Sequence, residues 1–187
     1  MHCWKSINLN KQYGVNRILL LSILTMLLAF ITLFTFLSLT FSVHTYRDDY
    51  AFFFLMALIF LYPTHKFLHF IPLIFMCKKV TFEFKSYNFI HDFPLKMKDP
   101  VSKKYFLFTL LTPFSFITIL LFVCTISYPA YAHYFTILLS VHFGICVSDF
   151  ITLWNLLKSP QKCLVEKSED GFEILIPKCW HVFNVCK

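Results

Sequence analysis

The sequence predicts an all-α integral membrane protein: a four-helix transmembrane bundle with a small cytoplasmic β-hairpin element. Three observations favour this fold class. The 187 residues are 58% hydrophobic and only 14% charged, whereas a soluble domain usually carries about 25% charged residues. The apolar residues lie in four long runs, and a helix needs about 20 such residues to cross a bilayer. The basic residues gather in alternate connections between these runs.

The four apolar runs are the predicted membrane helices, and they cover residues 18–43, 50–76, 105–132 and 134–157. The first run is about twice as long as the apolar part of a signal peptide, and no small-x-small cleavage pattern follows it. We therefore expect it to be a retained helix. The first and third runs contain no charge. The second run carries His65, Lys66 and His69, and the fourth carries His142 and Asp149.

The orientation of the bundle follows from its Lys and Arg residues. Of the 17 basic residues, 15 lie in the N-terminal segment, in the connection after the second helix, or after the fourth helix. Four crossings put these three segments on one side, and the positive-inside rule places that side in the cytoplasm. The prediction is a multi-pass protein of the cell membrane with both termini in the cytoplasm.

The basic residues also indicate which partners the protein has. The net charge of +7 reflects topology and attraction to anionic lipid, so the expected partner is the lipid bilayer and not nucleic acid. A membrane-protein partner or substrate is a further expectation. The seven cysteines contain no C-x-x-C pair, and a reducing compartment leaves them as thiols.

Two segments outside the membrane have the period-2 alternation of half-buried strands. The first is a hairpin over 80–85 and 95–98, within the cytoplasmic loop 77–104 of a membrane domain that covers residues 1–160. The second is a hairpin over 163–166 and 172–176, in a cytoplasmic tail that covers 161–187. An isolated hairpin is only marginally stable in water. The two hairpins could pair into one small sheet, and this hypothesis implies that they cover each other or the mouth of the bundle.

The polar residues inside the predicted helices are the candidate functional residues, because ionisable groups in a membrane usually face the bundle interior. His65 and His69 are four residues apart and share one helical face. This is the spacing at which two imidazoles bind one metal ion in the H-E-x-x-H motif. A packing or interfacial role for both histidines is the alternative.

Asp149 is predicted to lie at the same depth as the histidine pair. His65 comes 15 residues after Tyr50, and Asp149 comes 15 residues after Tyr134, so each is about 22 Å along its helix. Two imidazoles and one carboxylate would leave the fourth position of a tetrahedral Zn²⁺ open, as in catalytic zinc sites. His142, two turns before Asp149, is an additional candidate ligand.

Four stretches resemble a family of small bacterial membrane proteins of unknown function that are described as zincin peptidases. They are Cys3-Trp4-Lys5-Ser6-Ile7-Asn8, the histidine pair followed by Phe70-Ile71-Pro72, Leu110-Leu111-Thr112-Pro113, and the stretch from His142 to Asp149. The wider pattern is similar to intramembrane site-2-type metalloproteases. The resemblance implies that His65, His69 and Asp149 bind zinc.

One residue departs from the family pattern. The position after the first histidine of H-E-x-x-H is a glutamate that acts as the general base, and here it is Lys66. A charged lysine cannot accept a proton. Three interpretations follow: a degenerate, non-proteolytic member that retains a metal site, an active metalloprotease with another base, or a membrane protein whose histidines are structural. The first is favoured.

Overall fold

Four long helices dominate the protein. A computed structural model describes residues 2–40, 46–76, 80–82, 95–97, 100–161, 163–168 and 171–176. The long helices are α2 (Val15–Thr40), α3 (Ala51–Met76), α4 (Lys103–Ser127) and α5 (Ala132–Leu157). All four are long and apolar enough to cross a membrane, by length and composition. The prediction of four such helices is therefore confirmed, with ends that differ by a few residues.

The largest difference is at the end of the third helix, which was predicted to run to residue 132. α4 ends at Ser127, and a short 3-10 helix, η1 (Pro129–Tyr131), precedes α5. Proline disfavours the helical conformation in the residue before it, and Tyr128 accordingly has φ −130° and ψ 70°. The sequence analysis also missed α1 (Leu9–Tyr13), a single turn before α2.

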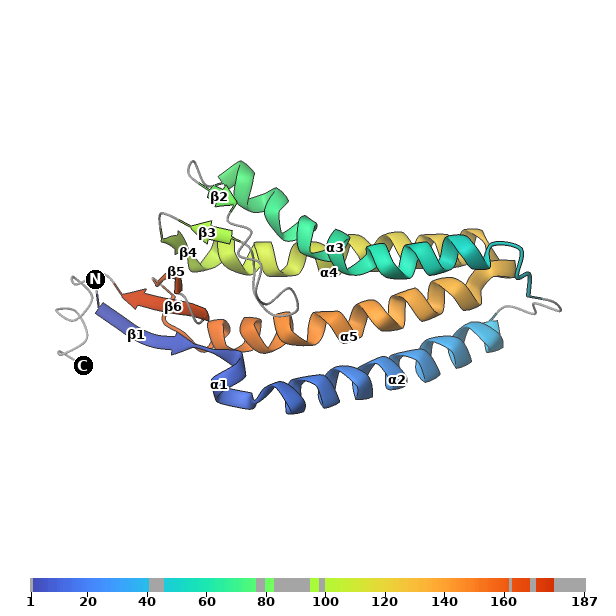
Figure 1. Cartoon of the computed structure of the whole chain (residues 1–187), viewed down its shortest axis with the longest axis horizontal. Coiled ribbons are helices and arrows are strands. Elements are labelled where there is room, and N and C mark those ends of the chain that lie inside the picture. The colour runs from blue at the N-terminus through green and yellow to red at the C-terminus, as the bar shows by residue number, and fades with distance from the viewer. Residues whose placement is uncertain are drawn as a thin grey trace.

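α5 is the central helix and packs against α2 on one side and α4 on the other, while α3 packs mainly against α4 (Figure 1). Gly144 lies where α5 meets α2. A Cβ atom at this position would lie 3.0 Å from Met26 Cγ and 3.1 Å from the Ser22 carbonyl oxygen. The missing side chain therefore allows the close helix approach that small residues give in membrane bundles.

The strands that the structure describes, β1 to β6, lie together at one end of the bundle (Figure 1). A four-stranded antiparallel sheet has the order β1-β6-β5-β4. Its strands are β1 (His2–Ile7), β4 (Val101–Ser102), β5 (Leu164–Ser168) and β6 (Gly171–Ile176). A separate two-stranded sheet joins β2 (Val80–Phe82) to β3 (Leu95–Met97).

Both predicted hairpins therefore form, but the hypothesis that they share one sheet is wrong. The edge of β5 pairs with β4, the two residues that lead directly into α4, and the edge of β6 pairs with β1. With both edges of the second hairpin taken, β2 and β3 pair only with each other among the described strands. The pairing of β1 was not expected from the sequence.

The four-stranded sheet covers the end of the helix bundle. Its buried residues Ile7, Val165 and Ile174 pack in one apolar cluster with buried residues of the helix ends, including Phe70, Leu73, Phe106 and Leu156. Lys103, the first residue of α4, links this helix to the C-terminal end of α5. Its buried Nζ donates to the carbonyl oxygens of Leu157 (3.1 Å) and Ser159 (2.6 Å), which satisfies acceptors that the C-terminus of α5 leaves unpaired.

Candidate metal centre

The two histidines of α3 lie inside the bundle, with no exposed surface. Their i, i+4 spacing puts both on the face of α3 that looks towards α4 and α5. The rings are almost perpendicular, at 83°, with centroids 4.9 Å apart. In this arrangement the Nε2 atoms of His65 and His69 lie 3.2 Å from each other.

Asp149 of α5 completes a triangle with these two nitrogens. Its Oδ2 lies 2.9 Å from His65 Nε2 and 3.2 Å from His69 Nε2, and the residue is almost buried. The convergence expected from the matching depths is therefore present. In a tetrahedral zinc site with bonds of about 2.0 to 2.2 Å, neighbouring ligand atoms lie about 3.3 to 3.5 Å apart. The three atoms fit one face of that tetrahedron after shifts of a few tenths of an ångström.

A backbone contact fixes the orientation of the His69 ring. His69 Nδ1 lies 2.9 Å from the carbonyl oxygen of Thr109 in α4. A carbonyl can only accept, so Nδ1 carries the proton and donates. The neutral ring then presents a lone pair at Nε2. A backbone carbonyl behind a histidine is the usual support of a metal-binding imidazole.

Pro113 explains why this carbonyl is available. In a regular helix the oxygen of Thr109 would accept from the backbone N–H of residue 113. Proline has no N–H, and Pro113 lies inside α4. The proline therefore leaves the Thr109 carbonyl without its helical donor, and the His69 ring supplies the replacement.

The triangle requires a proton or a cation among its three atoms. With the proton of His69 at Nδ1, its Nε2 faces a carboxylate oxygen and the Nε2 of His65, and two acceptors cannot bond to each other. A proton or a metal cation must therefore lie between these atoms. The donor set of two imidazoles and one carboxylate is one that zinc accepts, so the residues fit a zinc ion.

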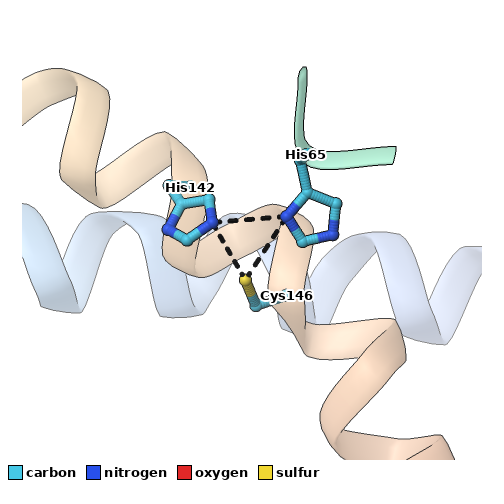
Figure 2. Close-up of side chains that lie close together, drawn as sticks. All are labelled: His65, His142 and Cys146. Carbon is cyan, nitrogen blue, oxygen red and sulfur yellow. Dashed lines mark hydrogen bonds between the residues drawn. The ribbon is translucent and has the colours of Figure 1, made fainter. Parts of the chain in front are cut away.

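His142 does not join this triangle. Its Nε2 instead lies 3.3 Å from Nδ1 of His65, the nitrogen on the far side of that ring from the one facing Asp149. Cys146 completes a second group, with Sγ 3.5 Å from His142 Nε2 and 3.9 Å from His65 Nδ1 (Figure 2). The sequence analysis missed Cys146, although it is four residues after His142 and therefore shares its face of α5.

Lys66 is half-buried, and its Nζ lies 5.6 Å from the centroid of the Tyr62 ring. This is a distance at which an ammonium interacts with an aromatic face. Among the described residues, no carboxylate other than Asp149 joins the histidines. Glu83 and Asp92, the loop carboxylates nearest in sequence, lie outside the described residues.

Comparison with known proteins gives one match. The sequence model of a family described as "Putative zincin peptidase" matches residues 58–164, which include His65, His69, His142 and Asp149. The matched segment covers more than half of the chain. No curated protein and no solved structure matches it.

Proposed function

The chain belongs to the "Putative zincin peptidase" family, and we propose that it is a membrane-spanning member that binds zinc without hydrolysing peptides. The observation that carries the proposal is the triangle of His65 Nε2, His69 Nε2 and Asp149 Oδ2, with sides of 2.9 to 3.2 Å. Zinc would supply a Lewis acid to this site. The general base of the H-E-x-x-H motif is missing, because Lys66 stands in the place of its glutamate.

The chain's own residues have separate parts in this proposal. His65 and His69 supply neutral nitrogen ligands, and Asp149 supplies the single negative charge. His69 is held by the Thr109 carbonyl, so its ligand atom is oriented before a metal arrives. Lys66 follows His65 directly in α3 and carries a positive charge. A charged ammonium takes up no proton from an attacking water, and it weakens binding of a dication.

The setting of this site is proposed to be the bilayer. Large apolar side chains on the outer face of α2 are exposed, among them Leu20 at 69% and Leu24 at 61%. Exposed apolar surface of this extent is expected for contact with lipid. Among the described residues, Lys5, Lys11, Lys103 and Lys158 lie at the sheet end of the bundle, so we place that end in the cytoplasm and propose that both termini lie there. A membrane-protein partner would reach the site from within the bilayer.

The first experiment is metal analysis of the full chain purified in detergent. We expect about one zinc ion per chain, because a buried preformed ligand set binds zinc tightly. His69→Ala made in a Cys146→Ala background should lose the zinc, because the thiol beside His65 then cannot hold the ion instead. His133→Ala in the same background is the matched control, since His133 pairs with Asp48 outside the triangle and its loss should leave the zinc content unchanged. Zinc content unaffected by His69→Ala in this background would remove the proposed site.

The second experiment separates a non-enzyme from an enzyme. The wild type should not cleave any of a panel of single-span membrane substrates. Lys66→Glu and Lys66→Gln should both raise zinc affinity by removing a charge, but only Lys66→Glu adds a general base, worth about 10²- to 10⁴-fold in rate. Cleavage by the wild type that disappears in His65→Ala would show an active protease with another base. Lack of zinc binding in both Lys66 variants would favour purely structural histidines.

A further inference from the structure

The second cluster of metal-ligating side chains lies on the other side of the His65 ring from Asp149. It joins Nδ1 of His65 in α3 to Nε2 of His142 and Sγ of Cys146 in α5, and Figure 2 shows the three atoms facing one another. All three residues are fully buried. The zinc triangle uses neither His142 nor Cys146, so the function proposed above gives these two residues no part.

We propose that these three atoms form a second metal position, which takes a thiophilic cation such as Zn²⁺ or Cu⁺. The separations support it. A tetrahedral ion with Zn–N bonds of about 2.0 Å and a Zn–S bond of about 2.3 Å places its nitrogens about 3.3 Å apart and each nitrogen about 3.5 Å from the sulfur. The corresponding distances are 3.3 Å between the nitrogens, and 3.5 and 3.9 Å to the sulfur.

His142 lacks the carbonyl support that orients His69, because no hydrogen-bond partner among the described residues reaches its buried Nδ1. The contacts of its ring nitrogens are therefore those of Nε2 with His65 Nδ1 and Cys146 Sγ. These contacts turn Nε2 towards the other two atoms of the cluster, as a shared ion requires.

The chemistry of the cluster selects the ion. A thiolate with two imidazoles is a softer ligand set than two imidazoles with a carboxylate, and soft sets favour Zn²⁺ and Cu⁺ over Mg²⁺ and Ca²⁺. The thiolate is the binding form of cysteine. Binding therefore releases the proton of the Cys146 thiol to the solvent and forms one metal–sulfur bond.

His65 links the two positions. A neutral imidazole offers one lone pair, so His65 can bind an ion through Nε2 beside Asp149 or through Nδ1 beside Cys146. The two positions therefore compete for this ring, and a single ion is distributed between them. This competition rests on the proposed zinc site, whereas the existence of the thiolate-bound position does not.

The test uses Co²⁺ as a spectroscopic substitute for zinc in the full chain, purified in detergent under reducing conditions. Cys179→Ser and Cys186→Ser form the background, so that tail thiols do not contribute. Only the second position has a thiolate, so only an ion there gives sulfur-to-cobalt charge-transfer absorption. We expect this absorption in the parent protein, with its loss in Cys146→Ser and in Cys146→Ala. Cys163→Ser, which alters another buried cysteine, should retain it.

Asp149→Asn distinguishes the two proposals. It weakens the first position and releases His65, so the thiolate absorption should increase. An increase supports both positions. Absorption that requires Cys146 but does not respond to Asp149→Asn keeps the second position and removes the competition for His65. Absorption that survives both Cys146 variants, or that is absent from the parent and from Asp149→Asn, overturns the second position whatever the zinc analysis gives.

Discussion

Replacing Pro113 by alanine tests whether the proline prepares the metal site. The substitution gives residue 113 a backbone N–H, and the nearest helical acceptor for it is the Thr109 carbonyl, which now accepts from His69 Nδ1 at 2.9 Å. The two donors would then share one oxygen. Since that contact orients the His69 ring, its weakening should lower zinc affinity without removing any ligand.

The size of the effect follows from the geometry. Loss of a partner that supports a metal ligand typically costs about 10- to 100-fold in affinity. A carbonyl oxygen has two lone pairs, so the new N–H weakens the His69 contact without abolishing it. We therefore expect Pro113→Ala to lower the zinc affinity by an amount near the lower limit, about tenfold, which is about 1.4 kcal/mol.

The assay is zinc affinity by competition with a chromophoric chelator, on the full chain in detergent. Thr109→Val is the matched control. It removes the hydroxyl, which donates to the Tyr105 carbonyl, and keeps the Thr109 carbonyl in place. It should bind zinc as the wild type does. Equal affinities for Pro113→Ala and the wild type, or an equal loss in Thr109→Val, would refute this account of the proline.

Three other predictions concern the fold. Gly144→Ala should lower the free energy of unfolding in detergent by about 1 to 3 kcal/mol, because its methyl group would press on α2; a melting temperature equal to the wild type's would contradict the close approach. Lys103→Met should lower it by about 2 kcal/mol, since the carbonyls at the end of α5 lose a charged donor; thermal unfolding measures this, and an unchanged stability would mean that water replaces the ammonium. A cysteine in place of Asp48 should react with an impermeant maleimide in intact cells, whereas one in place of Ser102 should react only after permeabilisation; labelling of the latter in intact cells would invert the proposed orientation.

The helices and the depth of the three candidate ligands could be predicted because they depend on features that are local in the sequence. An apolar run of the right length specifies a helix, and a fixed rise per residue converts position along the run into depth. His65, His69 and Asp149 come together for this reason. The i, i+4 spacing also put His142 and Cys146 on one face of α5, and that signal was available but unused.

The direction in which that face points could not be predicted. It depends on the rotation of α5 about its own axis, which is set by contacts with other helices, among them the close approach of α2 at Gly144. The sheet order was inaccessible for a similar reason. The residues of β1 show little apolar–polar alternation, so the sequence does not reveal that it pairs with β6.

The pairing of β1 with β6 has a consequence for the order in which the protein assembles during synthesis. β1 emerges from the ribosome before the four long helices, but its partner follows the fourth of them, so β1 lacks β6 while the helices are being made. Contacts between residues so distant in sequence form late, because a long loop must close first. Gly171 shows how tight that final step is, since a Cβ atom there would collide with the carbonyl of Ile7. Completion of the sheet therefore waits for β6, and until then the apolar side chain of Ile7 lacks part of its cover.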